Sequence, residues 1–296
     1  FLPAAVLCSP VNVNPTQVLL DSAVQIDEAR LTEKENIDPV LDEIYDLIRK
    51  GAIDIPPLPT EMQILMDKIN DPLLTVDQII ASITDPLLVS KILRVCNSPF
   101  YGRRGKVDTL RDAVVYMGLK SLMSIVTVNA LSSFSPLHIE QVEEILHHSL
   151  KVGIIAKQLA RDMGGNHDQA FVCGLLHDLG WIVMLEMLAK YDLDRAKRDR
   201  LIQTHHQTLG ALVAKKWNFS EEIQETIRYH HVPDKAQNHQ NLVQIIYLAN
   251  QLAKNEELPA GSPELTLSAV SADEQLPFSD QLDELDREID NILSHQ

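Results

Sequence analysis

The sequence contains few cysteines and comparatively few positive charges, and each scarcity excludes a class of protein. The three cysteines, Cys8, Cys96 and Cys173, are odd in number and far apart, which argues against a disulfide framework and favours a reducing cytoplasm. The 26 lysines and arginines are outnumbered by 42 acidic residues, and the net charge is −16. General nucleic-acid binding and binding to anionic membranes both need a basic surface, so we expect neither.

We also expect no long apolar run in the sequence. No run approaches the length of a membrane span, and the opening FLPAAVLC lacks the basic leader of a signal peptide. Position 1 is Phe rather than Met, so we expect the chain to be part of a longer polypeptide. The apolar content of 45% over 296 residues is ordinary for a soluble protein with one large domain or two small ones.

Helix signals follow one another along the chain, whereas no segment alternates cleanly enough to predict a strand. The capping pairs Thr60/Gln63 and Thr75/Gln78 each predict a helix start. Further helices are predicted from Asp85-Pro86 to Asn97, over 110–117, over 119–131 and over 240–253. We therefore predict an all-α fold of two helical lobes, the second a helical bundle.

Four parts of the chain are predicted from these patterns. They are an N-terminal arm or remnant of a preceding domain (1–37), a first helical lobe (38–136), a second helical lobe (137–255) and an acidic tail (256–296). The tail has eleven acidic residues and one basic residue, but its apolar residues near the end have helical spacing. We favour a helix that packs on its own protein over one that binds a partner.

The chemistry of the chain centres on His177-Asp178, an adjacent pair within an apolar stretch that we expect to be helical. Burying a carboxylate is costly unless it is hydrogen-bonded, paired with a cation or bound to a metal. Further histidines lie at long intervals: His148, which we place near the start of a helix, His206, which we expect to open one, and the pair His230-His231. Two readings stay open from these residues, a metal site built from separate helices and a buried hydrogen-bonded pair.

The order of short motifs resembles that of the HDOD domain, the HD-related output domain of bacterial signalling proteins. The first-half motifs are Ile55-Pro56-Pro57-Leu58-Pro59, the Asp85-Pro86 helix, Asn97-Ser98-Pro99-Phe100-Tyr101-Gly102 and Ala113-Val114-Val115-Tyr116-Met117-Gly118-Leu119. The second-half motifs are His148-Ser149, residues 174–180, His206-Gln207-Thr208-Leu209-Gly210, Trp217 and His230-His231. The resemblance covers residues 50–255 and makes the second lobe HD-like.

The resemblance implies kinship with metal-dependent HD phosphohydrolases. Carried over to this chain, the metal ligands are His148, His177, Asp178, His206, His230 and His231. They imply one or two divalent ions (Fe, Mn, Zn or Mg) and no organic cofactor. Asp178 and His206 become candidate catalytic residues, because a bridging carboxylate and a proton-donating histidine serve phosphoester hydrolysis.

Two departures from that pattern affect the expected function. Asn250 occupies the place of the last HD aspartate, and an amide is a weaker ligand than a carboxylate and no base. Val232-Pro233-Asp234-Lys235 replaces the signature of cyclic di-nucleotide phosphodiesterases after the His-His pair. We therefore expect a regulatory output module with a non-catalytic or vestigial metal site and signalling proteins as partners. The alternatives are an active phosphohydrolase acting on a nucleotide or other phosphoester, and a sensor of such a ligand.

Residues 91–120 are locally basic in an acidic chain, with seven lysines and arginines against two aspartates. This contrast is open to two interpretations: a site for a phosphorylated ligand or acidic partner, and a solvated loop or a surface that pairs with the protein's own acidic tail. We favour the second.

Overall fold

The computed structural model describes residues 39–40, 43–44, 75–101, 106–132, 138–254 and 278–293. The chain divides into two units, Phe1–Ile55 and Pro56–Gln296, and the four described residues of the first unit are helical. No strand occurs within the described ranges, so the all-α prediction is confirmed. The predictions for the first 37 residues, for the Thr60/Gln63 cap and for residues 133–137 concern positions that lie largely or wholly outside these ranges.

Capping and stop signals set the ends of the first helices as the sequence predicts. Helix α4 (Val76–Ile80) begins after Thr75, whose hydroxyl accepts from the Gln78 backbone while the Gln78 side chain caps Thr75. Helix α5 (Pro86–Asn97) ends before the short 3-10 turn η1 (Pro99–Tyr101). Helix α6 (Leu110–Ser132) is kinked at Gly118, whose φ of 79° only glycine adopts readily, and this kink separates the two helices predicted there.

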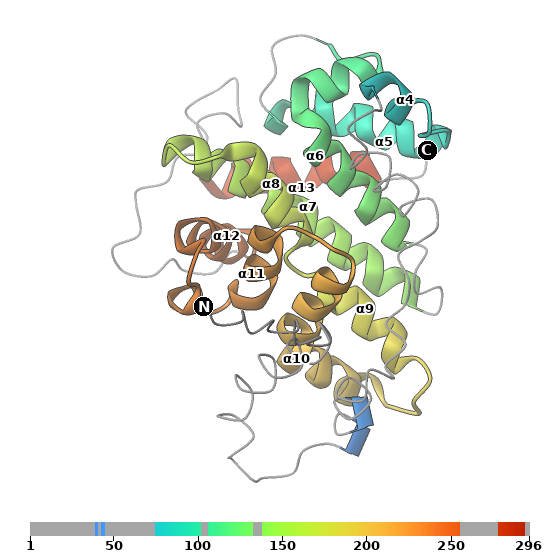
Figure 1. Cartoon of the computed structure of the whole chain (residues 1–296), viewed down its shortest axis with the longest axis vertical. Helices are drawn as coiled ribbons and strands as arrows, with labels where there is room; N and C mark the ends of the chain where they lie inside the picture. The colour runs from blue at the N-terminus through green and yellow to red at the C-terminus, as the bar shows by residue number, and fades with distance from the viewer. Residues whose placement is uncertain are drawn as a thin grey trace, which may run out of the picture. The chain divides into compact units, whose positions relative to one another are not determined.

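The remaining elements complete a helical bundle. They are α7 (Ile139–Asp162), α8 (His167–Leu176), α9 (Leu179–Leu188), α10 (Arg195–Lys216), α11 (Glu221–Tyr229), η3 (Pro233–Lys235), α12 (Gln240–Ala253) and α13 (Phe278–Leu293). Helix α12 has the predicted bounds. In Figure 1, α4, α5 and α6 lie at one end of this unit and α9 to α11 toward the other, with α7 and α8 between them.

Helix α7 is the centre of the packing. It contacts α8, α12, α13 and α6, and every residue from 149 to 160 is buried. At its crossing with α8, a Cβ on Gly174 would lie 2.8 Å from the Gly153 Cα. Only a pair of glycines therefore permits this approach, and it brings α8 and the segment after it close to α7.

Two stretches, Leu110–Ala130 and His167–Leu188, have the length and composition of membrane-spanning helices, which corrects the expectation that no such run exists. In their most apolar windows 56% and 83% of the residues are buried inside the protein. The second stretch is also broken between α8 and α9. Burial in the bundle accounts for the apolar character of both, as in core helices of soluble proteins.

Three local predictions for the histidines are wrong. His148 lies in the middle of α7 and His206 in the middle of α10, since these helices begin well upstream, at Ile139 and Arg195. His177 and Asp178 lie between two helices, as the C-cap of α8 and the N-cap of α9. The apolar residues on both sides concealed this break, since they pack into the core from two different helices.

Candidate metal centre

Asp178 lies at the junction of α8 and α9, and its side chain makes no capping hydrogen bond to the backbone of α9. The residue is 8% exposed. A capping aspartate ordinarily accepts from the first free N–H groups of its helix. Here both carboxylate oxygens are directed instead toward histidines of other elements. The partial positive charge at the start of α9 still favours an ionised carboxylate.

The Nε2 atoms of four histidines surround this carboxylate. His177 Nε2 lies 3.2 Å and His148 Nε2 4.0 Å from Oδ2. His206 Nε2 lies 3.5 Å and His230 Nε2 3.4 Å from Oδ1. The structure thus brings together residues from α7, the α8–α9 junction, α10 and the end of α11, which are up to 82 residues apart in the sequence.

Backbone contacts determine the tautomer of three of these rings. The Nδ1 atoms of His177, His206 and His230 lie 2.7, 3.0 and 3.0 Å from the carbonyl oxygens of Gly174, Ile202 and Ile227. A carbonyl only accepts, so each Nδ1–H donates and each neutral ring directs an Nε2 lone pair at Asp178. This is the arrangement that orients histidine ligands in metal sites.

The centre of the cluster therefore holds acceptors that face one another. The His177 Nε2 and Asp178 Oδ1 atoms are buried without a hydrogen-bond partner. Converging lone pairs repel each other unless a cation lies among them, and leaving buried polar atoms unsatisfied is costly. These residues fit a bound metal ion better than a closed hydrogen-bonded pair.

The cluster divides into two groups of three. His148, His177 and Asp178 form one, and His206, His230 and His231 form the other; within each, the ligand atoms lie within 4.8 Å of one another. Asp178 faces both groups with different oxygens, as a carboxylate that bridges two ions does. His231 is exposed and His148 half-buried, so the site reaches the surface at these two residues.

Asn250 lies beside the first group, on helix α12. Its Oδ1 lies 2.9 Å from His148 Nε2, and the residue is fully buried. A hydrogen bond at this position engages the His148 nitrogen that a metal would need. The amide Nδ2 has no hydrogen-bond partner. Asn250 would therefore bring no charge to a metal in the first group, and it competes with a metal for His148.

Burial favours the neutral form of four rings of the cluster, those of His148, His206, His230 and His231. Burial lowers the pKa of His148 and of His230 to about 4 and that of His231 to about 3, with neighbouring histidines adding to the effect at His148 and His231. Burial also lowers the pKa of His206. An ionised carboxylate among neutral imidazoles is the protonation state that binds metal.

Two supporting residues have no motif that sequence reasoning could detect. The Glu225 carboxylate accepts from the backbone N–H groups of Gln237, Asn238 and His239, and this holds the loop that follows His231. Lys254 lies one turn beyond Asn250 on α12, and its positive charge lowers the pKa of both His148 and His231. Only its spacing of four residues from Asn250 could have indicated it.

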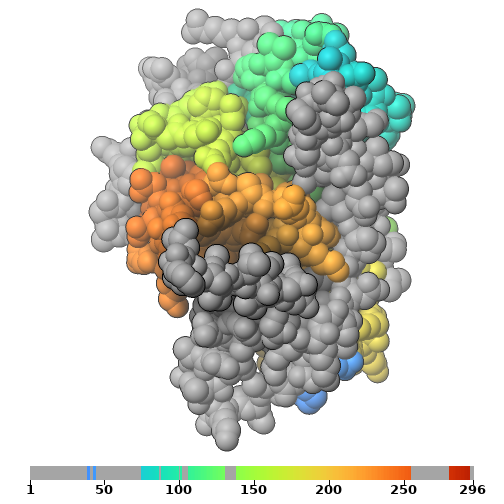
Figure 2. Space-filling model, in the orientation of Figure 1, coloured from blue at the N-terminus to red at the C-terminus, as the bar shows by residue number. Residues whose placement is uncertain are grey.

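Helix α10, which carries His206, approaches α9 as closely as α7 approaches α8. A Cβ on Gly180 would overlap the His206 backbone carbonyl, and a Cβ on Gly210 would lie 2.9 Å from the Gly180 Cα. This contact places His206 beside the α8–α9 junction. Figure 2 shows the orange surface of α11 and α12, which carry His230 and Asn250, next to the yellow-green surface of the α7–α8 region.

A bound divalent metal would polarise a phosphoryl oxygen and lower the pKa of a bound water. The protein's own contribution is positional. Asp178 and the oriented histidines would hold the ions, His231 and His148 border the solvent, and Lys254 supplies a positive charge at this border. Water or an anion could reach the cluster from that side.

Comparison with known proteins identifies the fold and its relatives. Residues 55–233, more than half of the chain, match the family model of the HDOD domain. An uncharacterized protein of Treponema pallidum (strain Nichols) is 28% identical over 218 residues, which are 67% of this chain and 42% of the relative. Ribonuclease Y of Thermotoga petrophila is 32% identical over 89 residues, 30% of this chain and 15% of the enzyme. The chain spans less than half the length of these relatives.

Solved structures share the arrangement of helices. A Shewanella amazonensis SB2B protein, named as a candidate metal-dependent phosphohydrolase, matches with a TM-score of 0.64 and 20% identity over 84% of this chain and 98% of that one. A Marinobacter aquaeolei VT8 protein, named as a candidate signal transduction protein, matches with a TM-score of 0.51 and 19% identity over 96% and 66%. At such identities the likeness establishes the fold.

Proposed function

Because the chain belongs to the HDOD family, we propose that it is a regulatory module of bacterial cytoplasmic signal transduction whose His/Asp cluster binds divalent metal ions without turning over a phosphoester. The observation that carries this proposal is the pairing of intact, oriented histidines with Asn250 at the position where a carboxylate would complete the first group. The ligands that build a site are present, whereas the residue that would complete its charge is not.

The electrostatic balance of the cluster supports a non-catalytic role. Two divalent ions bring four positive charges, and Asp178 is the one carboxylate that the described residues contribute to either group. Asn250 adds a neutral oxygen that already accepts from His148. A metal here would stabilise the junction of α8 and α9 against α7 and α10, which suits a structural or sensing site.

Metal content is the first test. We expect one or two equivalents of iron, manganese or zinc per chain by mass spectrometry of protein purified without chelators, and none in the His177→Ala/Asp178→Ala variant. The matched control is His167→Ala, a half-buried histidine outside the cluster, which should leave the metal content unchanged. A wild-type chain without metal after reconstitution with each of these ions would refute the metal site.

Turnover is tested on the reconstituted protein with a panel of nucleotides, cyclic nucleotides, RNA and a chromogenic phosphodiester. The proposal predicts no hydrolysis above that of the double variant with any of the metals. Binding of a nucleotide, seen as a thermal shift without product, would identify the protein as a sensor. That result agrees with a regulatory function.

The second candidate is a metal-dependent phosphohydrolase, and the complete second group of His206, His230 and His231 favours it. The similarity of 89 residues to ribonuclease Y makes a phosphodiester the substrate class to examine first. The net charge of −16 speaks against a long RNA and for a small phosphoester. Activity that is abolished in Asp178→Ala but retained in His167→Ala would establish this function and displace the first.

A further inference from the structure

A second region of the molecule combines an apolar groove with positive charge, and it lies on the side of α7 where the C-terminal helix packs. Helix α13 contacts α7 and α5, and Leu282, Leu285, Ile289 and Ile292 are each 3% exposed or less. These four residues have the a and d spacing of a heptad. We call the surface that they cover the α13 groove; it consists of Lys91, Arg94 and Val95 of α5, Ile125 of α6 and Leu146, His147, Leu150 and Lys151 of α7.

Charge complementarity distinguishes this contact from ordinary core packing. Residues 278–293 contain six acidic side chains and one basic side chain. Opposite them, Lys151 Nζ lies 2.7 Å from Asp286 Oδ2, and His147 Nε2 lies 3.3 Å from Asp290 Oδ1. An Arg94 guanidinium nitrogen donates to the Asn291 carbonyl at 2.7 Å, so part of the basic stretch 91–120 does face the acidic tail.

The Lys151–Asp286 pair fixes the register of the helix in the groove. The Lys151 side chain is 6% exposed, so this ammonium depends on the carboxylate that α13 supplies. A buried charge that loses its partner is strongly destabilising, and for that reason such pairs specify register more than they add stability. Any helix that occupies the groove needs an acidic residue directly after its second apolar residue.

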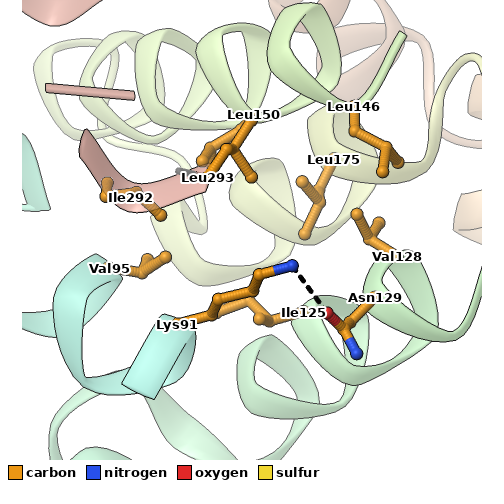
Figure 3. A pocket seen from close by; sticks show the side chains of 10 residues that line it. All are labelled: Lys91, Val95, Ile125, Val128, Asn129, Leu146, Leu150, Leu175, Ile292 and Leu293. Carbon is orange, nitrogen blue, oxygen red and sulfur yellow. Dashed lines mark hydrogen bonds between the residues drawn. The ribbon is translucent and has the colours of Figure 1, made fainter. Parts of the chain in front are cut away.

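Packing at the end of α13 is incomplete. A cavity of about 40 Å³, enough for water, is lined by Ile292 and Leu293 of α13 together with Lys91, Leu146 and Leu150. Figure 3 shows the Lys91 side chain extending across this space to Asn129, whose Oδ1 accepts from Lys91 Nζ at 3.1 Å. The groove is thus wider than α13 fills, and Leu175 of α8 also lines the cavity beside it.

The position of α13 in the chain makes it separable from the groove. The HDOD match ends at residue 233, and 23 residues connect Lys254 to Phe278. The groove itself is built entirely from residues 91–175, within the family match. A family core therefore presents a helix-binding surface, and a separate segment of the same chain occupies it.

From these observations we propose that the α13 groove is a docking surface for an acidic amphipathic helix of a partner protein, and that α13 occupies it as a competing intramolecular ligand. The partner helix carries the pattern Leu-x-x-Leu-Asp-x-x-Ile-x-x-Ile read from Leu282 to Ile292. Its apolar residues fill the groove and its acidic residue pairs with Lys151. This surface is distinct from the histidine cluster, and the proposal does not depend on metal binding.

Peptide exchange on the full chain tests this docking surface. A protease site is inserted between residues 255 and 277, and a fluorescent peptide with the sequence of residues 278–293 is added before and after cleavage. A tether holds its ligand at an effective concentration on the order of millimolar. We therefore expect at least tenfold tighter peptide binding, by fluorescence anisotropy, to the cleaved chain than to the intact one.

Register and chemical class are tested with altered peptides on the cleaved chain. Asp286→Lys in the peptide should weaken binding at least tenfold, and Lys151→Asp in the chain should restore it. The matched control is Asp283→Lys, at an exposed position one turn earlier, with an effect of less than about twofold. An unrelated peptide that carries the same pattern on an alanine and glutamate background should compete, whereas a scrambled version should not.

Four outcomes would overturn the proposal. The cleaved chain could unfold, which would make α13 a part of the cooperative core, or it could retain its own α13 without exchange. Equal affinity of the Asp286→Lys and Asp283→Lys peptides would remove the specific register. A dimer that forms by exchange of α13 between copies, seen by light scattering, would make a second copy the occupant in place of a partner.

Discussion

Two buried charges of this protein, Lys157 on α7 and Asp178 at the α8–α9 junction, have opposite surroundings. Lys157 Nζ lies 3.3 Å from the Asp168 carboxylate and 3.3 Å from the centre of the Tyr101 ring, so its charge meets a negative group and a π face. Asp178 meets four Nε2 atoms, and three of these rings direct lone pairs at it. The fold itself supplies the groups that stabilise the Lys157 charge. The Asp178 carboxylate, in contrast, needs a bound cation to be stabilised.

This difference separates a structural charge from a ligand site more sharply than burial does. Lys157 is 4% and Asp178 8% exposed, so exposure alone would treat them alike. What differs is the chemical character of the neighbouring atoms. Experiments that remove one charge, or the cation, should therefore give opposite results in the two places.

The largest effect is expected from Asp178→Asn, measured as the midpoint of chemical unfolding with metal and with a chelator. In metal the variant should lose roughly 4 kcal/mol, the stabilisation that a ligand at a thousand times its Kd provides. In chelator it should gain about 1 kcal/mol, because a buried amide is less costly than a buried carboxylate among lone pairs. Asp168→Asn, the control, removes the partner of Lys157 and should show the same loss in both conditions. A loss of equal size for Asp178→Asn in both would contradict the comparison.

The unfolding free energy of the chelated protein should depend on pH because its buried histidines are neutral. Their pKa values in the folded state, about 4 for His148 and His230, lie below the ordinary 6.5, so the unfolded chain binds more protons between these limits. Stability should therefore fall as the pH decreases from about 6.5 to 4. The loss should be on the order of 2–3 kcal/mol for the fully buried His230 and smaller for His148. A His230→Gln variant whose unfolding free energy kept the wild-type slope over this range would refute this assignment.

Placing a carboxylate at position 250 with Asn250→Asp should increase the difference in stability between the metal-bound and the chelated protein. The added charge beside His148 is expected to tighten metal binding about tenfold or more, which is about 1.4 kcal/mol, as measured by competition with a fluorescent chelator. The chelated variant should be less stable than wild type, since two carboxylates would then share a site without a cation. Unchanged affinity would show that Asn250 is not a ligand.

The smallest effect is expected at the satisfied charge. Lys157→Met keeps the length of the side chain and places a thioether over Tyr101, and replacing a satisfied buried pair in this way is often neutral. We expect a change in unfolding free energy within about 1 kcal/mol, with no dependence on metal. Lys157→Ala, which leaves a cavity, should cost more. A metal-dependent effect of Lys157→Met would mean that the two regions are coupled.

Local signals predicted the helices well where polar caps and apolar stripes coincide. Thr75 with Gln78, the Asp85-Pro86 start and the bounds of α12 are such places, and Gly118 marks a kink because of its positive φ. The start of α7, in contrast, has no side-chain cap at His138. Packing against α8 and α12 stabilises this helix, and such contacts with distant segments are not signalled at its start.

The candidate site shows the same limit. The resemblance to the HDOD domain indicated which histidines to consider, but periodicity placed His148 and His206 at helix starts and His177-Asp178 within one helix. The true placement depends on the break between α8 and α9 and on the contacts of Gly153 with Gly174 and of Gly180 with Gly210. These approaches join residues far apart in the sequence, so no local pattern encodes them.

The uncapped start of α9 has a consequence for how the protein divides its stability between folding and binding. A capping side chain adds about 1 kcal/mol to the stability of a helix. Asp178 occupies the capping position of α9 but makes no such hydrogen bond. The first turn of α9 is thereby left to depend on whatever binds the carboxylate. A metal bound as proposed would therefore couple its own occupancy to the order of this turn, and so to the backbone that separates α8 from α9.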